Sequence, residues 1–107
     1  MLSKKYRLPI QKFSKPRANL FEIARGKYFI VKSKPNKLLF SRFGVIISNK
    51  VNKSAVKRNK IKRIIFDFIR LKEYHLKTRK DILIIISPLV NKLTKKELEK
   101  ELEKYYG

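Results

Sequence analysis

The 107-residue chain contains no cysteine, no tryptophan, three glycines and eight acidic residues. Without cysteine, neither a disulfide framework nor a thiolate metal site can form. Three scattered glycines cannot build a glycine-rich phosphate loop. The longest apolar run, Ile82–Ile86, is too short to cross a bilayer, and no apolar stretch of signal-peptide length follows the basic start. These absences favour a cytoplasmic location and no membrane contact.

Residues suited to catalysis are also scarce. His75 is the only histidine, and we interpret it as a solvated surface residue at the end of a predicted helix. The acids near the C-terminus alternate with lysines, as surface ion pairs on a helix do. No zinc site or nucleophile–base pair can be assembled from the remaining residues. We therefore expect no catalytic residue and no metal site in the protein alone.

Positive charge, in contrast, is abundant. Lysine and arginine total 29, which gives a net charge of +21. Residues 49–72 hold nine of these cations and one acid, Asp67. Such a density repels itself unless a polyanion neutralises it, and nucleic acid is the commonest such partner. A basic surface without function is the alternative interpretation.

The first half of the chain predicts an arm, a short helix and two strands. Residues 1–16 are basic and interrupted by proline, so we expect an extended or loosely packed arm. Asn19 is a candidate cap for a helix over Leu20–Arg25, which Gly26 would end. Residues 28–31 and 38–48 predict two antiparallel strands joined by a turn at 33–37, with a bulge or bend near Arg42 and Gly44.

The second half predicts a helix, a buried strand and a final helix. Ser54 is a candidate N-cap for a helix that reaches about Tyr74. Its apolar arc is predicted to face the sheet and consists of Ile61, Ile64, Ile65, Phe68, Ile69 and Leu71. Phe66 lies outside this arc among cations, and we expect it to pack under a loop. The uninterrupted run Ile82–Ile86 predicts a strand buried on both faces.

The last helix begins with a predicted capping box formed by Thr94 and Glu97. Its apolar stripe is predicted to comprise Leu93, Leu98, Leu102 and Tyr105 or Tyr106. Together the elements predict an α/β protein (an α+β sandwich) in the order α-β-β(-β)-α-β-α, with helices packed on a mixed sheet of about four strands. We expect residues 1–107 to form a single RNA-binding domain. If the second strand and Ile82–Ile86 are parallel, the long helix connects them.

The long helix and the segment before it supply the candidate binding residues. Lysine and arginine along a helix can contact successive phosphates, and Asn59 can bond a base edge or a 2′-hydroxyl. The helix N-terminus adds free N–H groups and partial positive charge. The candidate RNA-binding residues are Lys50, Lys53, Lys57, Arg58, Asn59, Lys60, Lys62, Arg63 and Arg70.

The segment Arg58-Asn-Lys-Ile-Lys-Arg63 resembles the Arg-Asn-Arg-x-Lys-Arg signature of the bacterial ribonuclease P protein family. Residues 42–51 resemble the strand and lead-in before that signature, and Asp81–Pro88 resembles the closing strand. The sequence departs from the family where Lys60 replaces an arginine, which removes a planar, bidentate donor. Phe21 matches the family's N-terminal aromatic pattern only approximately.

The resemblance implies a fold like domain 2 of ribosomal protein S5 and an accessory role in an endoribonuclease. The partners would be ribonuclease P RNA and precursor tRNA, with no obligate protein partner. The RNA subunit would hold Mg²⁺ and remove the 5′ leader of the precursor. A cleft between the sheet and the first helix would hold that leader, with Phe13, Phe21 and Tyr28 as candidate contacts. A ribosomal protein or RNA chaperone without a role in cleavage is the alternative, whereas a DNA-binding protein would need a helix better suited to reading base edges.

Overall fold

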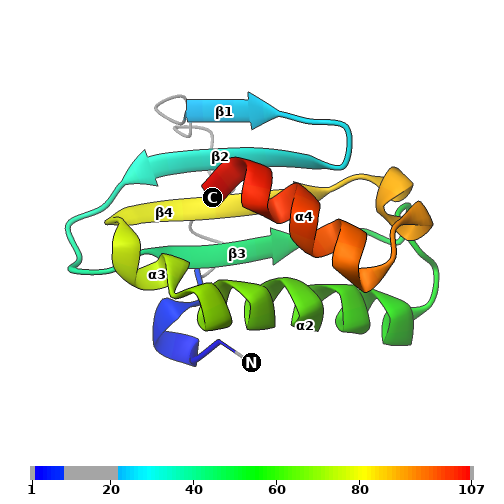
Figure 1. Cartoon of the computed structure of the whole chain (residues 1–107), viewed down its shortest axis with the longest axis horizontal. Coiled ribbons are helices and arrows are strands. Elements are labelled where there is room, and N and C mark those ends of the chain that lie inside the picture. The colour runs from blue at the N-terminus through cyan, green and yellow to red at the C-terminus, as the bar shows by residue number, and fades with distance from the viewer. Residues whose placement is uncertain (1, 9–21, 107) are drawn as a thin grey trace.

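The computed structural model describes residues 2–8 and 22–106, which form a four-stranded sheet with α-helices packed on one face (Figure 1). The strands are β1 (Glu22–Arg25), β2 (Phe29–Pro35), β3 (Arg42–Ile46) and β4 (Lys80–Ile86). The α-helices are α2 (Ala55–Lys72), α3 (Tyr74–Lys77) and α4 (Lys95–Tyr106), and the 3₁₀ turns are η1 (Lys4–Tyr6) and η3 (Pro88–Lys92). The predicted fold class is confirmed. No helix in this part of the chain could span a bilayer.

The central strand of the sheet is β4, as the uninterrupted run Ile82–Ile86 predicts. The strand order is β1-β2-β4-β3, with β4 antiparallel to β2 and parallel to β3. Ile82 and Ile84 belong to the large core under the helices, and Leu83 packs with Leu8 in a second cluster. Because successive side chains of a strand point to opposite faces, Leu8 and Leu83 lie on the face without the helices. Helix α2 connects the two parallel strands β3 and β4, as expected.

The predicted helix over residues 20–25 is wrong for Glu22–Arg25, which form β1. Each of these residues pairs with β2, from Glu22 opposite Ser33 to Arg25 opposite Ile30. The N–H of Gly26 donates to the Phe29 carbonyl at 2.8 Å and closes the hairpin. Pairing with β2 gives this short segment a partner for its backbone groups, and that gain outweighs a weak helical preference.

The two strands predicted from residues 28–48 do not pair with each other. Strand β2 continues to Pro35, which places the turn later than predicted, and β3 is shorter than the predicted range 38–48. The two strands run antiparallel, but β4 lies between them. The predicted bulge near Gly44 is absent, because Gly44 pairs with Leu83 in an unbroken register.

Helix α2 begins at the predicted cap, where the N–H of Lys57 donates to Ser54 Oγ at 3.3 Å. Ile65 and Ile69 are fully buried, whereas Leu71 is 66% exposed, so its predicted place in the apolar arc is wrong. Leu71 is six residues after Ile65, which at 100° per residue turns it about 120° away from the buried side. Phe66 is buried beside the N-terminal segment, where it and Leu8 line the same hollow. This agrees with the expected packing under a loop.

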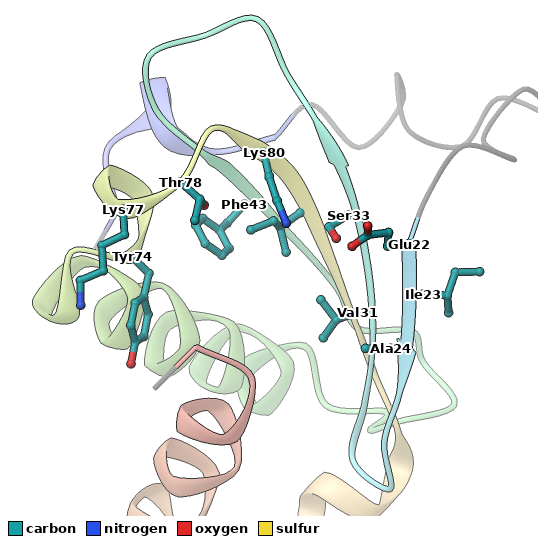
Figure 2. Close-up of a pocket in the computed structure, with 11 residues that line it drawn as sticks. Glu22, Ile23, Ala24, Val31, Ser33, Phe43, Tyr74, Lys77, Thr78 and Lys80 are labelled. Carbon is teal, nitrogen blue, oxygen red and sulfur yellow. The ribbon is translucent and has the colours of Figure 1, made fainter.

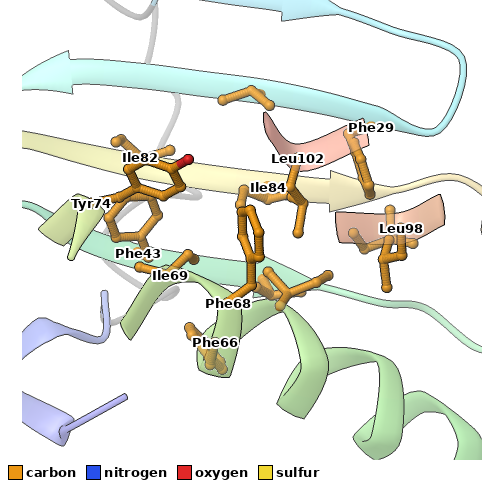
Figure 3. Close-up of a cluster of buried hydrophobic side chains, with 14 of the residues drawn as sticks. Phe29, Phe43, Phe66, Phe68, Ile69, Tyr74, Ile82, Ile84, Leu98 and Leu102 are labelled. Atoms are coloured by element: carbon orange, nitrogen blue, oxygen red, sulfur yellow. The ribbon is translucent and has the colours of Figure 1, made fainter. Parts of the chain in front are cut away.

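The core lies between the sheet and the two long helices (Figure 3). Phe68 and Ile69 of α2 and Leu98 and Leu102 of α4 pack together with side chains of all strands except β1. The predicted capping box of α4 is confirmed. The N–H of Thr94 donates to Glu97 Oε1 at 3.0 Å, and the N–H of Glu97 donates to Thr94 Oγ1 at 3.2 Å. The hydrogen bond from the Thr94 N–H to the carboxylate lowers the pKa of Glu97 below its ordinary value.

Residues 2–8 are packed against the body of the protein, which contradicts the predicted loose arm for this part. Leu2 and Leu8 are 2% and 5% exposed. The N–H of Leu8 donates to the Phe43 carbonyl at 2.8 Å, and Arg7 forms an isolated parallel bridge with the same residue. Residues 9–16 lie outside the described part of the chain.

A polar network joins the starts of β3 and β4. Arg42 donates Nε and Nη2 to the two carboxylate oxygens of Asp81, at 2.9 and 2.7 Å, and Asn36 Nδ2 donates to Asp81 Oδ1 at 3.0 Å. Burial by itself would raise the pKa of Asp81, but the hydrogen bonds from Arg42 and Asn36 and the nearby positive charges outweigh it. The pKa of Asp81 therefore lies below its ordinary value. The same pair raises the pKa of Arg42.

Replacing Asp81 by Asn should destabilise the protein by about 3 kcal/mol at neutral pH, because it leaves a mostly buried arginine without its counter-charge. The folded-state pKa of Asp81 is lowered, so the pair stabilises the protein above the unfolded-state pKa, and this stabilisation is lost as the pH falls through the folded-state pKa. Urea unfolding of both proteins at neutral pH and near pH 3 measures the difference. The gap should narrow in acid, and an equal gap at both pH values would contradict the argument. Glu103→Gln, which removes the exposed 3.6 Å pair with Lys72, is the control.

Replacing Leu2 by Ala should lower the free energy of unfolding by about 2–3 kcal/mol, because it leaves a cavity in the core. Leu39 is 78% exposed and gives a matched control with the same chemical change and almost no expected loss. Urea unfolding of the two variants measures the difference. Equal stabilities would show that residues 2–8 do not pack as the structure describes.

Candidate nucleic-acid interface

The exposed side of α2 carries a strip of candidate residues, defined as Asn59, Lys60, Arg63 and Arg70. Asn59, Arg63 and Arg70 are separated by four and seven residues, so the helical period places them along one line. Lys60 follows Asn59 on the same turn, about 100° further around the helix. We call this surface the outer strip. It is opposite the buried residues Ile65 and Ile69, so the core determines that the strip faces solvent.

The only acid on α2 is Asp67, which is half-buried. The other seven charged residues of α2 are all lysine or arginine, so one negative charge on the helix faces seven positive charges. A helix with this composition presents an attractive potential to a polyanion along its whole exposed length. The outer strip therefore has the charge that phosphate binding requires.

Two asparagines hold the loop that precedes α2, and sequence reasoning missed both. Asn52 Oδ1 accepts from the N–H of Ser54 at 2.9 Å, and Asn52 Nδ2 donates to Asn91 Oδ1 at 3.0 Å. Asn91 Nδ2 in turn donates to the carbonyls of Val51 and Pro88. The loop that carries the exposed Lys50 and Lys53 is thereby fastened to η3. Asn52 lies two residues before the cap, a spacing typical of an Asx turn, but its bond to Asn91 leaves no signal in the sequence.

Arg58 differs from the other candidates because its guanidinium is already engaged. Nη1 donates to the carbonyls of Asn52 and Lys53 at 2.8 and 3.1 Å, and the residue is half-buried. Arg58 therefore holds the loop against the first turn of α2. Its remaining N–H groups are donors for a ligand, but removing the side chain would also loosen the loop.

Lys57 and Lys62 lie on opposite sides of α2. Lys57 and Lys60 border a groove of about 460 Å³ that Lys95 borders from α4. Lys62 is half-buried and shares a hollow of about 340 Å³ with Lys4 and Arg7. The nine candidate residues thus do not form one flat patch. They surround the N-terminal half of α2, and Arg70 extends the outer strip towards its C-terminal end.

Of the three aromatic residues predicted to contact a leader, only Tyr28 is in the described part of the chain. It is half-buried against the large core, and Lys27 Nζ lies 5.5 Å from the centroid of its ring. Phe13 and Phe21 lie outside the described residues. The expected helical wall of the leader cleft is replaced by β1 over residues 22–25.

His75 is buried, so its predicted surface position is wrong. It is 7% exposed, and its ring centroid lies 4.4 Å from that of Tyr6. Glu73 adopts a left-handed conformation with φ of 56°, which ends α2 and turns α3 back towards the N-terminal segment. In the described residues, no group of three histidine, cysteine or acidic side chains is placed to hold a metal ion.

A capped basic helix packed on a small β-sheet is typical of a nucleic-acid-binding protein. Comparisons with known proteins identify the family to which the chain belongs. The Ribonuclease P family model matches residues 14–107. The chain is 36% identical over 85 residues to the ribonuclease P protein component of Fusobacterium nucleatum, covering 76% of each chain. It is 32% identical over 96 residues to that of Desulforapulum autotrophicum, covering 84% of this chain and 81% of the other.

Solved structures agree. The ribonuclease P protein of Staphylococcus aureus superposes with a TM-score of 0.81 at 28% identity, covering 92% of this chain and 90% of that one. The Thermotoga maritima protein, at 21% identity, shows the same fold with a TM-score of 0.81 over 92% and 95% of the two chains. The chain therefore belongs to the family of bacterial ribonuclease P protein components.

Membership of this family establishes the general role of the chain. Ribonuclease P is an endoribonuclease made of RNA and protein that acts in tRNA processing, and this chain is an RNA-binding accessory subunit of such an enzyme. Its partner is a ribonuclease P RNA. The family resemblance inferred from Arg58–Arg63 is confirmed.

Arg58→Ala and Arg63→Ala should differ in stability although both remove one cation from α2. Arg58→Ala should cost about 1–2 kcal/mol, because two hydrogen bonds from a charged donor to the loop are lost. Arg63 is exposed, and its removal should change the free energy of unfolding by less than about 0.5 kcal/mol. Thermal and urea unfolding of the two variants measure this difference. Equal losses would show that Arg58 does not hold the loop.

Proposed function

We propose that the outer strip of α2 and the loop before it bind ribonuclease P RNA near its catalytic core, and that the complex removes the 5′ leader of precursor tRNA with Mg²⁺. One observation supports this proposal most strongly. Three of the four outer-strip residues are cations, and the orientation of the strip is fixed by the buried residues on the opposite side of α2. A charged surface held in place binds phosphates with little further loss of conformational freedom.

The candidate contacts divide by task. Lys50, Lys53, Lys57, Lys60 and Lys62 act as point charges on phosphates, whereas Arg63 and Arg70 can bond two phosphate oxygens at once. Asn59 is the one uncharged candidate, and its amide can donate to and accept from a base edge or a 2′-hydroxyl. Arg58 contributes its charge while it holds the loop. Binding would thus depend mainly on the RNA backbone, and sequence or shape would be read at few positions.

Magnesium belongs to the RNA in this proposal. Phosphate and base oxygens supply the hard ligands that Mg²⁺ prefers, and the bound metal activates water against the phosphodiester. The protein neutralises phosphates that crowd around the docking surface. Less repulsion lets the folded RNA keep its metal ions at a lower magnesium concentration. Because tRNA processing needs no secretion, a cytoplasmic location fits this role.

We also propose that Tyr28 contacts the 5′ leader. Tyr28 is half-buried beside the exposed Lys27, so part of its ring is accessible for stacking on an unpaired base next to a cation. Phe13 and Phe21 are proposed with it from the family resemblance alone.

The double variant Lys60→Ala/Arg63→Ala should weaken binding to ribonuclease P RNA and reduce its salt dependence. Each lost phosphate contact should lower the slope of log K against log salt by about 0.7–0.9, so two contacts give about 1.4–1.8. Filter binding over a range of salt concentrations measures the slope. Precursor-tRNA cleavage by the reconstituted complex should also require more Mg²⁺.

Lys96→Ala/Lys100→Ala removes the same charge from exposed positions of α4 and serves as the control. Identical slopes for the two double variants would show that net charge, and not the outer strip, determines binding. Weaker binding with unchanged magnesium dependence would favour a role as an RNA chaperone outside cleavage.

A further inference from the structure

A hollow of about 560 Å³ lies on the helix-covered face of the sheet, beside α3 (Figure 2). Strands β1, β2, β3 and β4 and helix α3 all contribute to it. Its floor is apolar and consists of Val31, Phe43 and Ile82, and Tyr74 forms one wall. Pockets for small organic ligands usually measure about 300–1,000 Å³ and are lined in this way. The hollow is therefore large enough for a nucleotide.

Three polar groups converge over this apolar floor. Figure 2 shows the Lys80 ammonium reaching across the hollow towards Ser33 and Glu22 of the opposite strands. No ion pair joins Lys80 to a carboxylate within the described residues. Lys77 lies along the outer side of the wall, with Nζ 4.9 Å from the centroid of the Tyr74 ring. The Glu22 carboxylate, the Ser33 hydroxyl and the Lys80 ammonium thus face one open hollow.

We propose that this pocket binds one unpaired nucleotide of an RNA and prefers guanine or cytosine. The Glu22 carboxylate can accept hydrogen bonds from an exocyclic amino group, and Lys80 can donate to a carbonyl oxygen of the same base. Guanine and cytosine carry both groups. Uracil lacks the amino group and adenine lacks the carbonyl oxygen. The base face contacts Tyr74 and the apolar floor.

This pocket is separate from the outer strip of α2. None of the four strip residues lines the pocket. Lys60 and Arg63 precede the end of α2 at Lys72 by twelve and nine residues, which corresponds to about 18 and 14 Å along the helix. The pocket thus gives the protein a second contact that reads a base, whereas the outer strip binds backbone phosphates. The inference rests on the RNA-binding role proposed above, and it names a chemical preference that the outer strip does not supply.

The full-length ¹⁵N-labelled protein should be titrated with GMP, CMP, AMP, UMP and inorganic phosphate while amide shifts are recorded. GMP and CMP should move the amides of Ser33, Tyr74 and Lys80, with dissociation constants about tenfold lower than that of UMP, as expected for one well-made base contact. Inorganic phosphate alone should not saturate these shifts. Equal affinity for all four nucleotides, or amide shifts confined to residues 57–63, would contradict the proposal that this pocket binds guanine or cytosine.

Two substitutions separate the contributions of Glu22 and Lys80 to nucleotide binding. Glu22→Gln should remove most of the preference over UMP, because the amide can also donate to the carbonyl oxygens of uracil. Lys80→Met keeps about the same side-chain length and should weaken the binding of GMP, CMP and UMP, whose bases carry a carbonyl oxygen, more than the binding of AMP. Lys100→Met is the matched control and should change nothing.

The outcomes also distinguish this pocket from the proposed function. Binding of ribonuclease P RNA through the outer strip should respond to Lys60→Ala/Arg63→Ala, whereas nucleotide shifts at Ser33 and Lys80 should not. A Glu22→Gln protein that retains the preference for GMP and CMP would overturn the assigned base contact, even if it binds the large RNA normally.

Discussion

The packing of α2 against the sheet is the contact on which the other features depend. Ile65, Phe68 and Ile69 are buried between the helix and strands β3 and β4. This burial stabilises a chain whose net charge of +21 opposes compaction, because like charges repel in the folded state. It also fixes the rotation of the helix, so the cations of the outer strip face solvent together. One helix thus supplies part of the core on one side and the proposed RNA-binding surface on the other.

Elements with a strong local signal could be predicted from the sequence. Ser54 and Thr94 are caps because their side chains bond to residues three positions away, and this spacing is visible in the sequence. The buried position of β4 follows from the run Ile82–Ile86. Helical periodicity alone places the cations Lys60, Arg63 and Arg70 on the exposed side of α2. The family signature at Arg58–Arg63 then connected this pattern to its function.

Features that depend on distant partners could not be predicted. Strand β1 forms because β2 is available to pair with it, and its own residues carry little signal. His75 is buried by Tyr6, which is almost seventy positions earlier in the sequence. Asn52 and Asn91 meet across the gap between a loop and η3. The hollow beside α3 requires four strands and a short helix to be placed together, and no local pattern indicates that arrangement.

The bidentate bond between Arg42 and Asp81 has a consequence for how the sheet is aligned. The run Ile82-Leu-Ile-Ile-Ile86 is apolar on both faces, so sliding β4 by one residue would still bury isoleucine or leucine at nearly every site. Hydrophobicity alone therefore distinguishes poorly between neighbouring alignments. Arg42 and Asp81 are directly opposite each other at the beginning of the ladder. A slip would separate them and turn a carboxylate towards the isoleucines and phenylalanines beneath α2, so this ionic pair favours one alignment of β3 with β4.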